Sequence, residues 1–244
     1  MTALKENLPE TTPYLVKDYT EVYKPIMQFN KNKTAFIHQW YPFVEGYSKE
    51  FITNIIEEID YEPQLALDPF AGSGTTPVEL QEMGINCLSF EVSPFMHLLS
   101  TVKLERGYKL QDFIDHHITV GQFLNGKLNP IRQLMAPPLA RTFQPGKLKG
   151  KEKKKWVFNF GVMNGILDIK YAISLVPDEK YRKLFSIALA SILLDVSNVY
   201  RNGKCLSYKP KWQKRKISRR AVHKKFLDKL STMILKLSII EPLW

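Results

Sequence analysis

Apolar residues recur along this chain with the spacings of helices and of short buried strands. Apolar side chains at positions 51, 55, 56 and 59 follow a helical spacing, which predicts an amphipathic helix over residues 48–59. Two short apolar runs, residues 64–67 and 85–90, are instead typical of parallel strands buried on both faces. Between them, residues 77–83 favour a helix, with Pro77 in its first turn and a glycine just past its end. This order of strand, helix and strand predicts the opening of a doubly wound α/β sheet.

The pattern changes along the rest of the chain. Residues 94–104 predict a further helix, whereas residues 107–155 contain several prolines and no sustained period, as expected of an insertion that is part helix and part loop. Residues 185–194 are apolar nearly all round, which predicts a buried helix, and the apolar residues from Val222 to Leu237 predict an amphipathic one. We therefore divide the chain into a polar N-terminal arm (1–35), an α/β unit (36–106), an insertion with a basic loop (107–155) and a helical region with a basic segment (156–244).

Charge adds a candidate partner. The chain carries a net charge of +11, and the excess is concentrated in residues 147–155 and 209–229, which hold six and ten basic residues with one acid each. Such stretches often are solvated faces, but two of them beside a ligand motif favour contacts with nucleic-acid phosphates. Trp212 lies within the second stretch and is a candidate for stacking on bases. The candidate nucleic-acid-binding residues are Lys209, Lys211, Trp212, Arg215, Arg219 and Arg220.

The sequence disfavours a membrane protein, a secreted protein and a metal-binding protein. The longest apolar run, near residues 187–194, is too short to cross a bilayer, so we expect no membrane partner. The first residues lack the pattern of a secretory signal. Cys87 and Cys205 have no metal-site spacing and form no disulfide framework, so we expect no metal and a reduced, cytoplasmic setting.

A glycine loop at residues 68–76, Asp-Pro-Phe-Ala-Gly-Ser-Gly-Thr-Thr, separates the first predicted strand from the next helix. A phosphate-binding P-loop needs a lysine after its last glycine, and none follows Gly74. A dinucleotide site needs a third glycine where this chain has Pro77. The residue types therefore disfavour both of these ligand classes.

Two acidic strand ends give the loop a different chemistry. The carboxylate of Asp68 suits a cationic group, such as the amino group of S-adenosylmethionine. Glu91 follows Gly72 by 19 residues at the end of the second strand, where a carboxylate accepts hydrogen bonds from ribose hydroxyls. Glycines at 72 and 74 permit a tight turn with positive φ and a close approach of the backbone to a ligand. Together these residues predict S-adenosylmethionine as the cofactor.

The loop at residues 68–76 closely resembles the cofactor motif of DNA amino-methyltransferases, which methylate adenine N6 or cytosine N4. Residues 90–94, Phe-Glu-Val-Ser-Pro, are similar to the next motif of that family, and residues 38–51 resemble the segment that packs on the methionine part of the cofactor. The resemblance implies a Rossmann-like S-adenosylmethionine-dependent methyltransferase fold and DNA as substrate. The loop and the resemblance together assign to the cofactor Tyr47, Ser48, Asp68, Pro69, Phe70, Ala71, Gly72, Ser73, Gly74, Thr75, Thr76, Glu91 and Val92.

The catalytic motif of that family, (Asp/Asn/Ser)-Pro-Pro-(Tyr/Trp/Phe), is not found in these 244 residues. The Pro-Pro pair at residues 135–139 lacks both the polar residue and the aromatic ring, although residues 201–204 resemble a region upstream of the motif in longer members. We therefore expect an incomplete α/β fold with a helical insertion, and no catalytic residue on this chain. A second methyltransferase subunit that carries the catalytic motif and target recognition is the expected partner. A non-catalytic remnant that binds DNA or another protein, and an RNA methyltransferase, stay open as alternatives.

Overall fold

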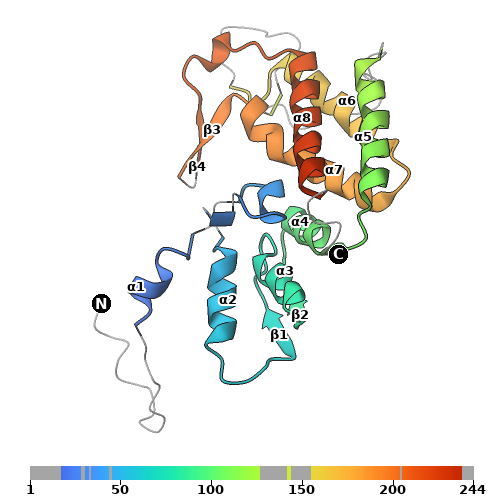
Figure 1. Ribbon diagram of the computed structural model, residues 1–244. Helices are drawn as coiled ribbons and strands as arrows, with labels where there is room; N and C mark the ends of the chain where they lie inside the picture. The colour runs from blue at the N-terminus through green and yellow to red at the C-terminus, as the bar shows by residue number, and fades with distance from the viewer. Residues whose placement is uncertain are drawn as a thin grey trace.

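The structure, a computed structural model, describes residues 18–28, 31–32, 34–43, 46–126, 142–143, 155–203 and 205–237. These residues form an α/β unit and a bundle of helices that lie one above the other in Figure 1. Ahead of the first strand come α1 (Thr20–Tyr23), η2 (His38–Trp40) and α2 (Lys49–Glu57). The Pro-Pro pair at 137–138 and most of the lysine run at 147–155 lie outside the described residues.

The α/β unit contains the predicted strand, helix and strand. β1 (Leu65–Asp68) and β2 (Asn86–Ser89) pair in parallel, with Asp68 opposite Ser89. α3 (Thr75–Glu82) connects them and packs against β2, α2 and the following helix α4 (Pro94–Leu104). α3 begins two residues before the predicted start because Gly74, in the left-handed conformation, already ends the loop. The mixed α/β class is confirmed, whereas extension to a Rossmann-like sheet remains a prediction.

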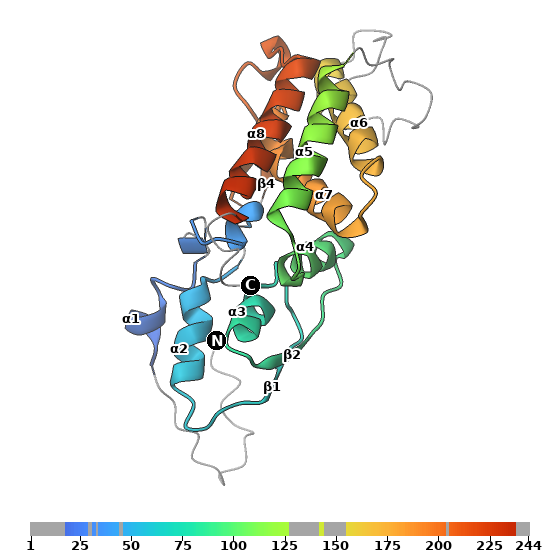
Figure 2. The same cartoon turned by 45° about the vertical axis from the view of Figure 1, so that its right-hand side comes forward.

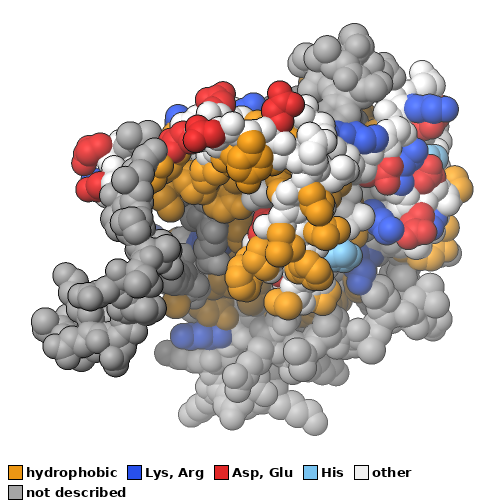
Figure 3. Space-filling model, turned by 90° about the horizontal axis from the view of Figure 1, so that it is seen from below, with side chains coloured by type: hydrophobic (Ala, Val, Ile, Leu, Met, Phe, Trp, Pro, Cys, Tyr) orange, Lys and Arg blue, Asp and Glu red, His pale blue; other side chains and the backbone are white. Residues whose placement is uncertain are grey.

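One face of the β1–β2 sheet is exposed, contrary to the expectation of strands buried on both sides. Leu65 and Leu67 alternate with inward-facing residues along β1, and Leu67 is 65% exposed. On the neighbouring strand Leu88 shares this face with them, and Phe90 just beyond it is 61% exposed. The expectation fails because the leucines on this face stay more than half exposed, while α3 packs against β2. Figure 3, a view from below, shows hydrophobic side chains gathered at the surface on this side of the molecule.

The bundle consists of four long helices that enclose an apolar core. They are α5 (Leu110–Asn125), α6 (Phe160–Ser174), α7 (Glu179–Val196) and α8 (Arg219–Leu237). Each packs against at least two of the others, and α5 and α8 remain side by side in the turned view of Figure 2. The helical period predicted for α8 is confirmed, since Val222, Phe226, Leu230 and Met233 are all buried. α5 lies in the range that the sequence assigns to an insertion, yet it is one wall of this bundle.

A hairpin that the sequence analysis did not predict follows α7. β3 (Val199–Asn202) pairs antiparallel with β4 (Cys205–Tyr208), and a short helix η3 (Trp212–Lys214) leads on to α8. Gly203 in the turn has a φ of +58°, a conformation that glycine adopts without strain. The dipeptide Asn202-Gly203 is a typical hairpin turn sequence, so the signal was present.

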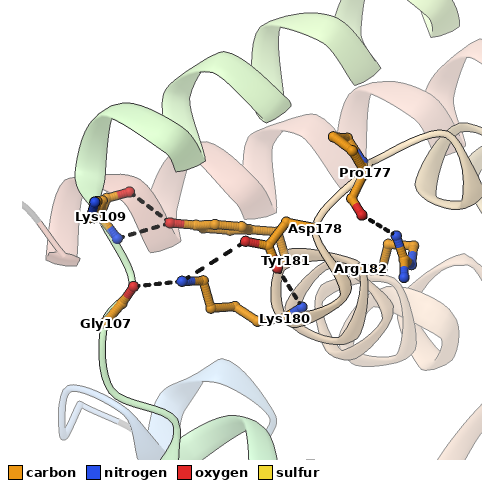
Figure 4. A network of polar contacts seen from close by, with 7 residues as sticks. All are labelled: Gly107, Lys109, Pro177, Asp178, Lys180, Tyr181 and Arg182. Atoms are coloured by element: carbon orange, nitrogen blue, oxygen red, sulfur yellow. Dashed lines mark hydrogen bonds and ion pairs between the residues drawn. The ribbon is translucent and has the colours of Figure 1, made fainter.

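A polar network ties the connection between α4 and α5 to the start of α7 (Figure 4). The segment that leaves α4 runs past the start of α7, where Lys180 Nζ donates to the carbonyl of Gly107 at 2.7 Å. The Tyr181 hydroxyl accepts from the amide of Lys109 at 2.8 Å and donates to its carbonyl at 3.0 Å. Asp178 caps α7 by accepting from the Lys180 amide. Because these bonds join residues about 72 positions apart, they fix the point at which the chain enters the bundle.

Candidate cofactor site

The loop between β1 and α3 is a tight turn held by its own backbone. Gly72 and Gly74 have φ values of +52° and +79°, so both adopt the left-handed conformation that the sequence analysis assigned to them. The Gly74 amide donates to the Ala71 carbonyl at 2.8 Å, and the Ala71 amide donates to the Phe90 carbonyl at 2.9 Å. The turn is therefore anchored to the end of the second strand, and α3 begins directly after it.

Asp68 has one carboxylate oxygen in use and one free. Its side chain is buried, and Oδ1 accepts from the Phe70 amide at 3.0 Å. Oδ2 is buried without a hydrogen-bond partner. A buried carboxylate oxygen left in this state is costly, and an ammonium group would satisfy it. The residue thus fits the amino group of the methionine part of S-adenosylmethionine.

Glu91 joins the glycine loop to the start of α4. Its Oε2 accepts from the Gly72 amide at 2.8 Å and its Oε1 accepts from the Ser93 amide at 2.7 Å. Each carboxylate oxygen has a second lone pair, so both can still accept from a pair of ribose hydroxyls. Val92 beside it is 98% exposed, which leaves an apolar side chain available to a ligand.

Tyr47 and Ser48 come from the segment ahead of α2, and Tyr47 reaches the same site. The Tyr47 hydroxyl is hydrogen-bonded to Thr76 Oγ1 in the first turn of α3, and burial raises the pKa of that hydroxyl. Ser48 is fully buried, and its amide donates to the Ile26 carbonyl at 3.0 Å, which fixes this segment in place. The structure therefore brings Tyr47 to the loop, whereas the backbone hydrogen bonds of Ser48 lie within residues 26–51, ahead of the loop. Ala71, Ser73 and Thr75 are buried in the loop itself, whereas Pro69 and Phe70 are exposed.

A buried polar cluster behind the loop was missed by the sequence analysis. His38 Nε2 is 2.8 Å from Glu79 Oε1, and both side chains are buried. Burial lowers the pKa of His38, so its imidazole is neutral near pH 7. Lys103 on α4 is also buried and donates to the Ser73 carbonyl. The helical period was the available signal, because Lys103 follows the apolar Leu99 by four residues and shares its buried face.

The residues predicted to bind nucleic acid fall into two groups. In the first, the side chains make intramolecular contacts: Lys209 Nζ donates to three carbonyls at the end of α7, at 3.0 to 3.2 Å. Trp212 is buried between the rings of Trp156 and Tyr208, with centroids 4.9 and 5.0 Å away. Arg219 forms a two-pronged ion pair with the buried Asp168.

The second group stays at the surface. Lys211 and Arg220 are exposed, and Arg215 is half-buried. Two neighbours that were not singled out from the sequence, Lys214 and Lys216, are exposed as well. A cationic surface therefore persists around η3 and the start of α8, although half of the predicted residues serve the fold. In the part of the chain that the structure describes, no helix is long and apolar enough to span a membrane.

Comparison with known proteins finds similarity to DNA methyltransferases. Residues 15–101 match the family model described as DNA methylase. The Type II methyltransferase M.BsoBI of Geobacillus stearothermophilus is 31% identical over 107 residues, which cover 39% of this chain and 21% of that protein. The Type II methyltransferase M.MjaII of Methanocaldococcus jannaschii is 33% identical over 81 residues, 33% of this chain and 15% of that protein. The match to the DNA methylase family thus covers the glycine loop and the strands on either side of it.

A third relative fits the same picture. The Type II methyltransferase M.AvaI of Nostoc sp. is 28% identical over 94 residues, 37% of this chain and 20% of that protein. The matches thus span only 15% to 21% of the length of these relatives. No solved structure matches it.

Proposed function

We propose that this chain binds S-adenosylmethionine at the glycine loop and is the cofactor-binding part of a DNA methyltransferase that acts on an exocyclic amine of adenine or cytosine. The observation that carries the proposal is the buried, unpartnered Oδ2 of Asp68 beside a loop of the methylase type. When bound, S-adenosylmethionine supplies an activated methyl group on its sulfonium. The chain's own residues hold that donor in place.

We assign each residue of the site to one part of the cofactor. Asp68 Oδ2 accepts from the ammonium group of the methionine part, a charge-assisted bond in a dry environment. Glu91 uses its remaining lone pairs on the ribose hydroxyls. Tyr47 and Thr76, bonded to each other, form the wall at the start of α3. The exposed apolar side chain of Val92 is available to an adenine ring.

The target amine needs a group from outside these residues. Its lone pair is delocalised into the base, so methyl transfer requires an acceptor that polarises it and an aromatic ring that holds the flipped base. We infer that a second methyltransferase subunit provides both. The exposed sheet face of Leu65, Leu67 and Leu88 supports this, because parallel strands are stable when both faces are covered.

The cationic surface around Lys211 and Arg220 supports DNA as the polyanionic partner. Contacts of this kind position a duplex without reading its sequence, in keeping with target recognition by the second subunit. The names of the relatives point to Type II restriction–modification systems.

The test is a methyl-transfer assay with tritiated S-adenosylmethionine. The second protein is the product of a neighbouring open reading frame that carries an Asp-Pro-Pro-Tyr-like motif, and its Asp→Ala variant is the control. We expect label in DNA only when both proteins are present and the motif is intact. Label in RNA instead of DNA would favour an RNA methyltransferase. Cofactor binding without transfer to either nucleic acid would favour a non-catalytic remnant.

A further inference from the structure

Lys103 is a fully buried lysine that the proposed chemistry does not use. Its side chain is 0% exposed, and Nζ donates to the Ser73 carbonyl at 2.6 Å. Lysine is almost never fully buried unless its charge is paired. The nearest acidic influence is Glu79 on α3, whose Oε1 is already bonded to His38. The ammonium is therefore held mainly by one carbonyl of the glycine loop.

Two residues of α4 contact the loop at adjacent positions. Lys103 bonds the carbonyl of Ser73, and Ser100, one turn earlier on the same face, approaches the next residue, Gly74. A Cβ built on Gly74 would lie 2.7 Å from Ser100 Cβ. Because the Ser73 carbonyl and the Gly74 amide belong to one peptide plane, the lysine fixes the direction of that plane. α3 starts with the following residue, so the same bond also orients its first turn.

The buried amine costs stability that an apolar side chain would not. Burial lowers the pKa of Lys103 to about 7. A group whose folded pKa lies below its unfolded value near 10.5 favours unfolding until the pH rises past that unfolded value. A methionine of similar length would fill the same space without this cost. This loss of stability is understandable if the bond to Ser73 contributes to ligand binding at the loop and not to the stability of the fold.

We propose that Lys103 is a positioning residue, whose ammonium holds the Ser73–Gly74 peptide in the orientation that S-adenosylmethionine binding requires. The inference rests on the proposed cofactor site. Two titratable groups lie near it on the packed elements, Glu79 on α3 and His38 on η2. His38 is neutral near pH 7, so the local charge there changes with the protonation of Lys103. Deprotonation weakens the bond to Ser73, since a charge-assisted hydrogen bond becomes a neutral one.

The experiment is calorimetric titration of the full chain with S-adenosylhomocysteine from pH 6 to 8.5. We expect Lys103→Met to bind about tenfold more weakly than wild type at pH 6.5, because the loop populates its binding conformation less. Its melting temperature should be equal or higher. Lys103→Gln retains N–H donors without charge, so it should bind better than the Met variant. The ratio of the wild-type affinity to the Lys103→Gln affinity should fall as the pH rises through 7. Titration of the ligand affects both proteins equally and cancels in this ratio.

Lys180→Met is the matched control. Lys180 also donates to a backbone carbonyl, that of Gly107, but outside the loop. Lys180→Met should leave the affinity for S-adenosylhomocysteine unchanged. Equal affinities for wild type and Lys103→Met would overturn the inference while leaving the proposed function intact, whereas absence of binding by wild type would overturn the proposed function itself. If Lys103→Met does not fold, a wild-type to Lys103→Gln ratio that stays constant with pH overturns the inference.

Discussion

The two parts of this molecule differ in how complete they are. In the bundle, α5 to α8 bury their apolar residues against one another. In the α/β unit, a two-stranded sheet leaves leucines of both strands exposed on one face. The part with the closed core contains the cationic surface, and the part with the open sheet contains the glycine loop. The bundle therefore covers its own apolar residues, whereas the unit that contains the glycine loop leaves an apolar sheet face exposed, for which we propose a partner.

The largest effect is expected at Asp68. Asp68→Asn keeps the acceptor for the Phe70 amide but turns the second oxygen into a donor that faces the cofactor ammonium. Loss of a buried charge pair costs about 3–5 kcal/mol, so the affinity for S-adenosylmethionine should fall by about a thousandfold. Folding stability should change little, since one unpaired buried polar atom replaces another while a buried carboxylate charge is removed. Calorimetry checks the affinity, with the exposed Asp60→Asn as control. An unchanged affinity would contradict the assigned role.

Gly74→Ala should destabilise the α/β unit by about 2–3 kcal/mol, from strained φ and from the clash with Ser100. Gly84 is the matched control, because it has a similar φ of +74° but nothing within 4 Å of an added Cβ. Gly84→Ala should therefore cost only about 1 kcal/mol. Chemical denaturation measures both variants. Equal losses would show that the contact between α4 and the loop has no energetic weight.

Within the bundle, Arg219 and Arg220 should behave differently although they are adjacent. Arg219→Ala leaves the buried Asp168 with only His223 as a partner, and should cost about 2 kcal/mol of stability. Arg220→Ala removes an exposed charge and should change stability by less than about 0.5 kcal/mol. It should instead lower the affinity for DNA and reduce the slope of log K against log salt by about 1. Identical effects of the two variants on stability would contradict the assignment of Arg219 to the fold and of Arg220 to DNA binding.

The smallest effect on folding is expected at the open sheet face. Leu67→Glu should change the stability of the isolated chain by less than about 0.5 kcal/mol, because the side chain is already exposed. With the second protein present, the same variant should abolish methyl transfer, since a charge would be buried in the contact. Ala66→Glu lies on the other face of the sheet and should lower the stability of the isolated chain. Transfer at wild-type rates by Leu67→Glu would remove this face from the proposed interface.

Much of the local geometry of the candidate site was predictable because residue type alone constrains it. Acidic strand ends and glycines that require positive φ define the turn, and the helical period defined the buried face of α8. Pairs of charged side chains that are distant in the sequence could not be predicted from it. Arg219 bonds Asp168, which lies 51 residues earlier, so its basic character suggested a phosphate contact. The exposure of β1 was also unpredictable, because an apolar run does not show whether its second face will be covered.

We propose that these residues bind S-adenosylmethionine on their own and that methyl transfer requires a second subunit. The most direct test is calorimetric titration of the purified wild-type chain with S-adenosylmethionine, with Asp68→Asn beside it. We predict one site per chain in the wild type and at least about a thousandfold weaker binding in the variant. A folded wild-type chain that shows no binding heat and no shift in melting temperature with the cofactor would contradict the account.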